Sequence, residues 1–132
     1  MSRKSVAQKL FIKEDYRILV LNEPKGYRST LGGLPPNVTE LTELDESLDL
    51  IQVFAVTRKE LEEQLPKLKR LLKPKGLLWV TYPKGTSKIA RAGKVDINRD
   101  SIWKLVEPLG MRPVAMISID ETWSAMRLKI VP

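Results

Sequence analysis

The chain has 132 residues, 42% of them hydrophobic, and a net charge of +7. It contains no cysteine and no histidine, which excludes disulfides, thiolate zinc sites, iron–sulfur clusters and hydrolysis by Ser-His-Asp or Cys-His arrangements. Any metal ion would need carboxylate or carbonyl oxygens as ligands, and we expect none. A chain of this length is expected to form one domain, residues 1–132, around a single core.

Two features of the sequence bear on its location. The longest apolar runs, such as residues 77–80, are far shorter than the roughly 18 residues that a membrane span requires. The first 13 residues carry charges where a signal peptide needs an apolar stretch. We therefore expect a cytoplasmic protein that does not associate with a membrane.

The first half of the chain predicts short helices alternating with strands. Turn residues such as Pro24 and Gly26 separate the apolar runs, and Ser5 is a suitable cap for the opening helix. The predicted elements are a helix over 5–11, a buried strand over 16–22, a short helix over 26–31, a loop over 32–37, and strands over 38–44 and 49–56.

A longer helix is predicted after the third strand. Residues 57–60, Thr-Arg-Lys-Glu, match the capping box that begins a helix. Leucines recur at three- and four-residue steps over 61–72, which predicts an apolar stripe against the sheet. Pro66 removes one helical amide, so we expect the helix to bend or divide near Gln64. Residues 73–76, Lys-Pro-Lys-Gly, are typical of a helix end.

The second half continues the alternation and closes with two strands. Trp79, Trp103 and Phe54 are assigned to the core, because large aromatic side chains are usually buried. The predicted elements are a strand over 77–82, a basic loop over 83–95, a helix from Asn98 or Asp100 to Leu109 that ends at Gly110, and strands over 111–119 and 123–131 joined by residues 120–122.

This order of elements favours a three-layer α/β sandwich. Parallel neighbours need helical crossovers, so we expect a mostly parallel sheet in the order 2-1-3-4-6-5, with strand 6 antiparallel. Ligands of such sheets bind outside the C-terminal ends of the strands where the order reverses, here between the first and third strands. The segments expected at that edge are residues 22–27, 57–58 and 82–88.

The sequence also resembles two known protein families. The run over 71–80, Leu-Leu-Lys-Pro-Lys-Gly-Leu-Leu-Trp-Val, and the layout from Tyr16 onward resemble the core of class I S-adenosylmethionine-dependent methyltransferases. That resemblance implies a Rossmann-like, methyltransferase-like fold that ends in an antiparallel hairpin. Residues 78–84 and 119–124 are similar to a small bacterial family of unknown function. The signature that carries this second resemblance is Asp120, Glu121, Thr122, Trp123 and Ser124, and it implies no activity.

The methyltransferase resemblance implies a cofactor that the first loop does not favour. In that family the loop is glycine-rich, because its backbone must come close to the methionine moiety of S-adenosylmethionine. Here residues 23–26 are Glu-Pro-Lys-Gly, with one glycine, and the proline fixes φ and removes an amide. Glu40 or Glu43 would be the acidic residue that holds the ribose hydroxyls. We expect no bound cofactor.

The positive charge gathers in one part of the chain. Residues 58–94 carry eleven Lys or Arg against three Asp or Glu, whereas residues 21–57 carry two against six. Some of these cations lie on the solvated face of the predicted helix. Those after residue 83 fall at the expected ligand edge, beside amides and hydroxyls that are able to hold an anion. The candidate anion-binding residues are Lys25, Gly26, Lys84, Gly85, Thr86, Ser87, Lys88 and Arg91.

Three functions agree with the sequence. We favour a non-catalytic binding or interaction module whose basic loop takes an anionic small molecule or a protein partner. The second is an enzyme, either a degenerate methyltransferase or one acting on an anionic substrate, with Glu23 or Asp120 as general acid or base. The third is weak binding of nucleic acid by the basic stripe, where Tyr82 is the only neighbouring aromatic. A homodimer formed through a strand edge, at residues 38–44 or at the terminal hairpin, is a further alternative.

Overall fold

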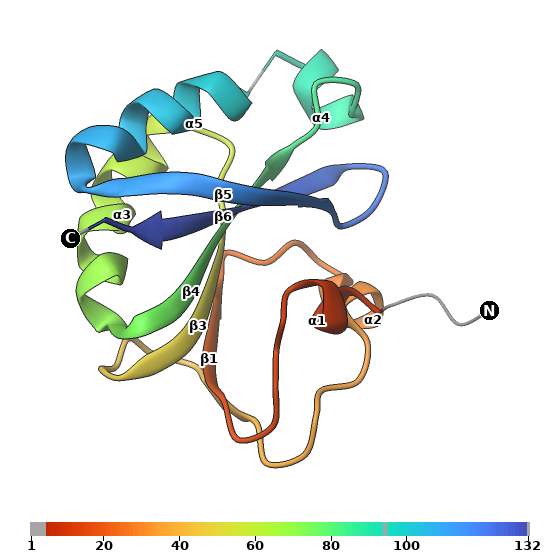
Figure 1. The fold of residues 1–132 in the computed structure, drawn as a ribbon. Coiled ribbons are helices and arrows are strands. Elements are labelled where there is room, and N and C mark those ends of the chain that lie inside the picture. The colour runs from red at the N-terminus through yellow and green to blue at the C-terminus, as the bar shows by residue number, and fades with distance from the viewer. Residues whose placement is uncertain (1–4, 94, 132) are drawn as a thin grey trace.

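The computed structural model describes residues 5–93 and 95–131 (Figure 1). Its elements follow the predicted alternation. In chain order they are α1 (Val6–Lys9), β1 (Arg17–Leu21), α2 (Tyr27–Leu31), β2 (Thr39–Leu41), β3 (Leu48–Phe54), α3 (Arg58–Leu71), β4 (Leu72–Pro83), α4 (Lys88–Arg91), α5 (Arg99–Val106), the 3₁₀ helix η1 (Glu107–Leu109), β5 (Met111–Ser118) and β6 (Trp123–Ile130).

The six strands form one mixed sheet in the order β2-β1-β3-β4-β6-β5. The first four in that order are parallel, and β6 runs antiparallel to both of its neighbours. The predicted strand order and terminal hairpin are therefore confirmed. The two edges are β2 and β5, and pairing of either with a second copy stays a prediction.

Helices cover both faces of the sheet and give the three predicted layers (Figure 1). On one face, α3 and α5 bury apolar side chains against β3 and β4, and the leucine stripe of α3 is fully buried at Leu61, Leu65 and Leu68. On the other face, α1 and α2 pack around Trp79. The apolar core thus lies on both sides of the central strands, and the loops at the sheet's ends carry the polar side chains.

The long helix α3 begins as predicted but is not divided. Thr57 and Glu60 form the expected capping box, with the Thr57 hydroxyl accepting from the Glu60 amide. The helix then continues through Pro66 to Leu71, so a division near Gln64 does not occur, and the alternative of a bend there stays a prediction. A proline removes a single hydrogen bond, and the leucines before and after it remain buried on the same face.

Other boundaries and one core assignment also differ from the predictions. Strand β4 begins at Leu72, so residues 73–76 belong to the strand and do not form a separate stop. Trp103 is 48% exposed, and its assignment to the core is wrong. On α5 the buried positions are Ile102 and Val106, four residues apart, which turns the intervening Trp103 toward solvent.

Two features are absent from the described residues. Within 5–93 and 95–131, no helix has the length and apolar character needed to cross a bilayer. In the same part of the chain, Asp and Glu side chains do not gather in threes as a metal site would require.

Candidate functional site

The turn after β1 lies where the topology places a ligand. Gly26 has a φ of 84°, and the amide of Tyr27 donates to the carbonyl of Pro24 over 3.1 Å. A Cβ built on Gly26 would meet no atom within 4 Å. The glycine is therefore required by the left-handed backbone of the turn, and it does not form a cradle around a neighbouring group.

The side chain of Tyr27 packs against the C-terminal half of β3, in the core on the α1–α2 side of the sheet. It is 2% exposed, and its ring meets Phe54 edge-on with centroids 4.7 Å apart. Its hydroxyl donates to Gln52 Oε1 over 2.6 Å, and Gln52 Nε2 donates to Thr81 Oγ1 over 3.0 Å. Burial raises the pKa of Tyr27 well above its usual value, so the phenol stays neutral. This part of the edge is closed by a hydrogen-bonded, buried network.

An ion cluster covers the neighbouring part of the same edge. Arg28 Nε donates to Glu23 Oε2 over 2.9 Å, and Arg28 Nη1 donates to Glu40 Oε1 over 2.5 Å. The hydrogen bonds to Glu40 and Glu23 raise the pKa of Arg28 further above its usual value. Both carboxylates are therefore engaged, which leaves Glu23 poorly placed to act as a general acid or base.

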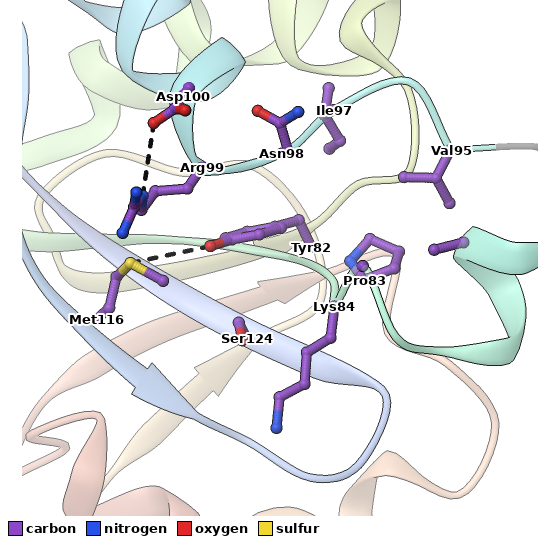
Figure 2. A pocket seen from close by; sticks show the side chains of 12 residues that line it. Tyr82, Pro83, Lys84, Val95, Ile97, Asn98, Arg99, Asp100, Met116 and Ser124 are labelled. Atoms are coloured by element: carbon purple, nitrogen blue, oxygen red, sulfur yellow. Dashed lines mark hydrogen bonds and ion pairs between the residues drawn. The ribbon is translucent and has the colours of Figure 1, made fainter.

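An open cavity of about 540 Å³ lies at the C-terminal end of β4 instead (Figure 2). It is bounded by the end of β4, the start of α5 and the hairpin strands β5 and β6. We call it the β4 cavity. Its lining residues are Tyr82, Pro83, Lys84, Gly85, Ala90, Val95, Ile97, Asn98, Arg99, Asp100, Met116 and Ser124.

The inner part of the β4 cavity is largely apolar. Tyr82 and Ile97 are each 5% exposed, and the Tyr82 hydroxyl reaches the Met116 sulfur over 3.9 Å. Burial raises the pKa of Tyr82, although the nearby Arg99 acts in the opposite direction by favouring the phenolate. A neutral phenol and a thioether therefore offer surface to an apolar group, with one weak hydrogen-bonding position.

The rim of the β4 cavity carries two cations. Lys84 Nζ donates to Ser118 Oγ over 2.6 Å, which holds the ammonium without neutralising it. Arg99 Nε lies 3.5 Å from Asp100 Oδ1, and both side chains are more than 60% exposed, so their attraction is weak. Figure 2 shows Arg99 beside the Tyr82 hydroxyl and Met116. Arg99 is thus available to an anionic group in the cavity.

The structure brings together only some of the predicted anion-binding residues. Lys84 and Gly85 line the β4 cavity. Ser87 is buried, donates to the Lys84 carbonyl over 2.6 Å and accepts from the Ala90 amide, so its hydroxyl caps α4. The remaining predicted residues are not among those lining the cavity: Thr86, Lys88 and Arg91 belong to the turn and to α4, and Lys25 and Gly26 to the turn before α2.

The Asp120–Ser124 segment builds the hairpin. Asp120 Oδ1 accepts from the amides of Thr122 and Trp123 over 2.8 and 2.9 Å, so this carboxylate holds the turn and is not free for catalysis. Trp123 is 7% exposed and packs edge-on against Phe54, with centroids 5.1 Å apart. The Lys84 amide donates to the Thr122 carbonyl over 2.7 Å. The hairpin turn is therefore hydrogen-bonded to Lys84, at the start of the basic loop.

Sequence reasoning missed Arg99, Asp100 and Met116 as residues of the site. Asn98 was predicted as a helix cap, and its Oδ1 does accept from the Ser101 amide over 2.9 Å. Strand β6 is antiparallel to both β4 and β5, so β4 and β5 run in the same direction. The helix that connects β4 to β5 must therefore begin at the edge of the sheet where β4 ends. The predicted topology was therefore enough to place Arg99, the first residue of that helix, at this edge, whereas nothing in the sequence pointed to Met116.

The sequence matches no protein-family model and no curated protein. The structure is similar to a SAM-dependent methyltransferase from Aquifex aeolicus, with a TM-score of 0.67 and 17% identity over 96% of this chain and 88% of that one. It is similar to DhpI, solved with SAH, with a TM-score of 0.62 and 13% identity over 96% and 83%. A TehB-like SAM-dependent methyltransferase from Corynebacterium glutamicum has a TM-score of 0.59 and 14% identity over 98% and 89%. These matches show a methyltransferase-like fold.

The residues at the β1–β3 edge do not fit S-adenosylmethionine. The Tyr27 side chain is buried against Phe54 and Gln52 of β3 and offers no exposed group to a ligand, and Gly26 lies beside open space and not against a neighbouring group. Glu40, one of the two acidic residues expected to hold ribose hydroxyls, is bound to Arg28. The β4 cavity is lined by other residues.

Proposed function

We propose that this domain binds an anionic small molecule in the β4 cavity and does not transfer methyl groups. One observation carries the proposal: the edge between β1 and β3 is closed by Tyr27 and the Arg28 cluster, while the neighbouring edge at β4 is open and carries Lys84 and Arg99. Fold alone assigns no activity, so the side chains at the two edges decide the function.

The lining of the cavity defines the chemical class of the ligand. Tyr82, Ile97 and Met116 suit an apolar or aromatic body. Either Arg99 or Lys84, which Figure 2 shows at different ends of the rim, suits one carboxylate or phosphate. The α5 N-terminus adds a partial positive charge at the same side. Asp100 disfavours a second anionic group and favours a hydroxyl or amine there. The ligand is therefore expected to be mono-anionic with a compact apolar part.

The remaining predictions fit within this proposal. The Asp120–Ser124 signature, proposed as that of a family of unknown function, acts here by supporting the loop that holds Lys84. We place the domain in the cytoplasm. A protein partner that presents a carboxylate to the same cavity is an alternative ligand of the same chemistry.

Methyl transfer is the second candidate function, and the fold likeness favours it. The structures it resembles are described as SAM-dependent methyltransferases, and one was solved with SAH. This alternative requires Tyr27 to leave its buried position, and it requires either Glu40 to leave Arg28 or Glu43 to hold the ribose.

A thermal-shift screen distinguishes the two functions, because a ligand that prefers the folded state raises its stability. The purified chain is screened at fixed salt against aromatic carboxylates, phosphosugars, nucleotides, S-adenosylmethionine and S-adenosylhomocysteine. We expect shifts with mono-anionic ligands that Lys84→Gln reduces and the matched surface variant Lys59→Gln leaves unchanged. A shift with S-adenosylhomocysteine, retained in Lys84→Gln, would establish the methyltransferase alternative.

A further inference from the structure

A second cavity, of about 470 Å³, lies at the opposite end of β4, where that strand begins. It lies between the first residues of β4 and the last residues of the β5–β6 hairpin, and Leu77 and Val114 give it an apolar part. We call it the basic groove. Its lining residues are Pro74, Lys75, Gly76, Leu77, Val114, Arg127, Leu128, Lys129 and Ile130, three of them cations and none of them acidic.

The cations of the basic groove lack acidic partners within the described residues. The nearby carboxylate of Asp49 forms an ion pair with Lys73, whose Nζ lies 3.0 Å from Asp49 Oδ1. Lys75, Arg127 and Lys129 form no ion pair in that part of the chain. Uncompensated like charges around one concave surface concentrate the positive potential there and attract an anionic partner.

An exposed aromatic ring lies beside the groove. Phe11 is 43% exposed, and the Arg127 guanidinium lies 5.3 Å from the centroid of its ring. Phe11 has a φ of 63° because it ends α1: its amide donates to the Gln8 carbonyl over 3.0 Å, and the Ile12 amide donates to the Ala7 carbonyl over 3.1 Å. The turn is held in place because Trp79 Nε1 donates to the carbonyl of Leu10 over 3.0 Å. The ring of Phe11 is therefore exposed, on a backbone that is fixed by the end of α1 and by Trp79.

A further cation extends this surface along the hairpin. Lys9 Nζ lies 3.4 Å from the carbonyl oxygen of Ser118, which pairs with Ser124 at the start of β6. Arg127 and Lys129 follow three and five residues later on β6. At about 3.4 Å per residue the cations therefore span roughly 17 Å, and Phe11 lies against the middle one.

We propose that the basic groove, with Phe11 and Lys9, binds single-stranded nucleic acid without sequence preference. Backbone phosphates contact Lys9, Arg127 and Lys129, and one base stacks on Phe11 beside the guanidinium. Cations along a track with an exposed ring are the combination that single-strand binders use. An acidic peptide would satisfy the cations but would leave Phe11 without a planar partner. The basic groove shares no lining residue with the β4 cavity, although Lys9 and Lys84 both contact Ser118. The substitutions that test the groove lie outside the cavity, so either proposal can fail alone.

The first test measures binding of a fluorescent twelve-nucleotide oligothymidylate by anisotropy over a range of salt concentrations. The variant Arg127→Gln with Lys129→Gln removes two cations from the groove. We expect the slope of log affinity against log salt to fall by about 1.4, since each phosphate contact contributes about 0.7 for a single strand. The matched control is Lys59→Gln with Lys104→Gln, which removes the same charge from exposed positions on α3 and α5. An equal loss in both variants would overturn the proposal, because binding would then follow net charge alone.

The second test addresses the stacked base. Phe11→Leu keeps an apolar side chain at an exposed position, and thermal unfolding checks that the variant folds. We expect a loss of roughly fivefold or more in oligonucleotide affinity, from a stacking contribution of about 1–3 kcal/mol. Binding of a poly-glutamate probe should be unaffected by the same variant. Unchanged oligonucleotide binding in Phe11→Leu, with poly-glutamate bound equally well, would identify an acidic protein segment as the occupant and overturn nucleic-acid binding.

Discussion

Two neighbouring regions at the C-terminal edge of the sheet differ in whether a ligand can enter: one is buried and the other is open. Between β1 and β3, Tyr27 packs on Phe54 and closes a hydrogen-bonded network with Gln52. At the end of β4, the same edge is open and has Arg99 at its rim. Both regions have the backbone positions that α/β sheets use for ligands. The comparison teaches that a methyltransferase-like fold supplies the place for a site, and a few side chains decide whether it is available.

The largest expected effect comes from emptying the closed region. Tyr27→Ala removes a buried ring and leaves Gln52 without its hydrogen-bond donor, so we expect a loss of about 3–5 kcal/mol in the free energy of unfolding. Urea denaturation followed by circular dichroism measures it. Ser29→Ala, at an exposed position of the same helix, is the control and should change stability by less than about 0.5 kcal/mol. A loss below about 1 kcal/mol would mean that Tyr27 does not close the edge.

The closed region also predicts how stability depends on pH. Burial raises the pKa of Tyr27 above that of the unfolded chain, which is about 10. The unfolded state therefore loses its proton first, so this contribution to stability is complete below about pH 10 and is lost as the pH rises further. Each unit of pH above that value should cost about 1.4 kcal/mol for one such phenol.

Denaturation at pH 7 to 11 tests this dependence. Tyr82 titrates in the same direction, because its burial also raises its pKa. Tyr27→Phe should therefore remove part of the decline and leave the part due to Tyr82. A variant whose pH dependence matches that of the wild-type chain would show that the Tyr27 hydroxyl is in contact with solvent.

The sheet was more accessible to sequence reasoning than the two regions that distinguish its function. Apolar runs and the Thr57–Glu60 capping box define strands and helix starts locally, and crossover rules then restrict the strand order. Pairings such as Arg28 with Glu40 depend on where a short helix lies against an edge strand, which no local pattern records. Phe11 and Arg127 are separated by most of the chain, so the aromatic beside the basic groove was invisible from the sequence.

Two arginines test whether the ligand binds in the β4 cavity. Arg99 lines the β4 cavity, whereas Arg91 was predicted from the sequence and is not among the lining residues. For the mono-anionic ligand with the largest thermal shift, we expect Arg99→Gln to lower affinity roughly tenfold, as loss of a charged hydrogen bond does, and Arg91→Gln to change it by less than twofold. Isothermal titration calorimetry at fixed salt measures both. A larger loss of affinity in Arg91→Gln than in Arg99→Gln would show that the ligand binds at the basic loop and not in the β4 cavity.

The smallest effect is expected at the ion cluster of the closed region. Glu40→Gln removes one carboxylate from Arg28, which keeps its contact with Glu23, and all three side chains are partly exposed. Exposed pairs contribute about 0–1 kcal/mol, so unfolding at low salt should change within that range and the change should shrink at 1 M salt. A salt-independent loss above about 2 kcal/mol would show that the cluster is desolvated. The ions would then hold the edge closed together with Tyr27, and the closure would depend on electrostatics as well as on packing.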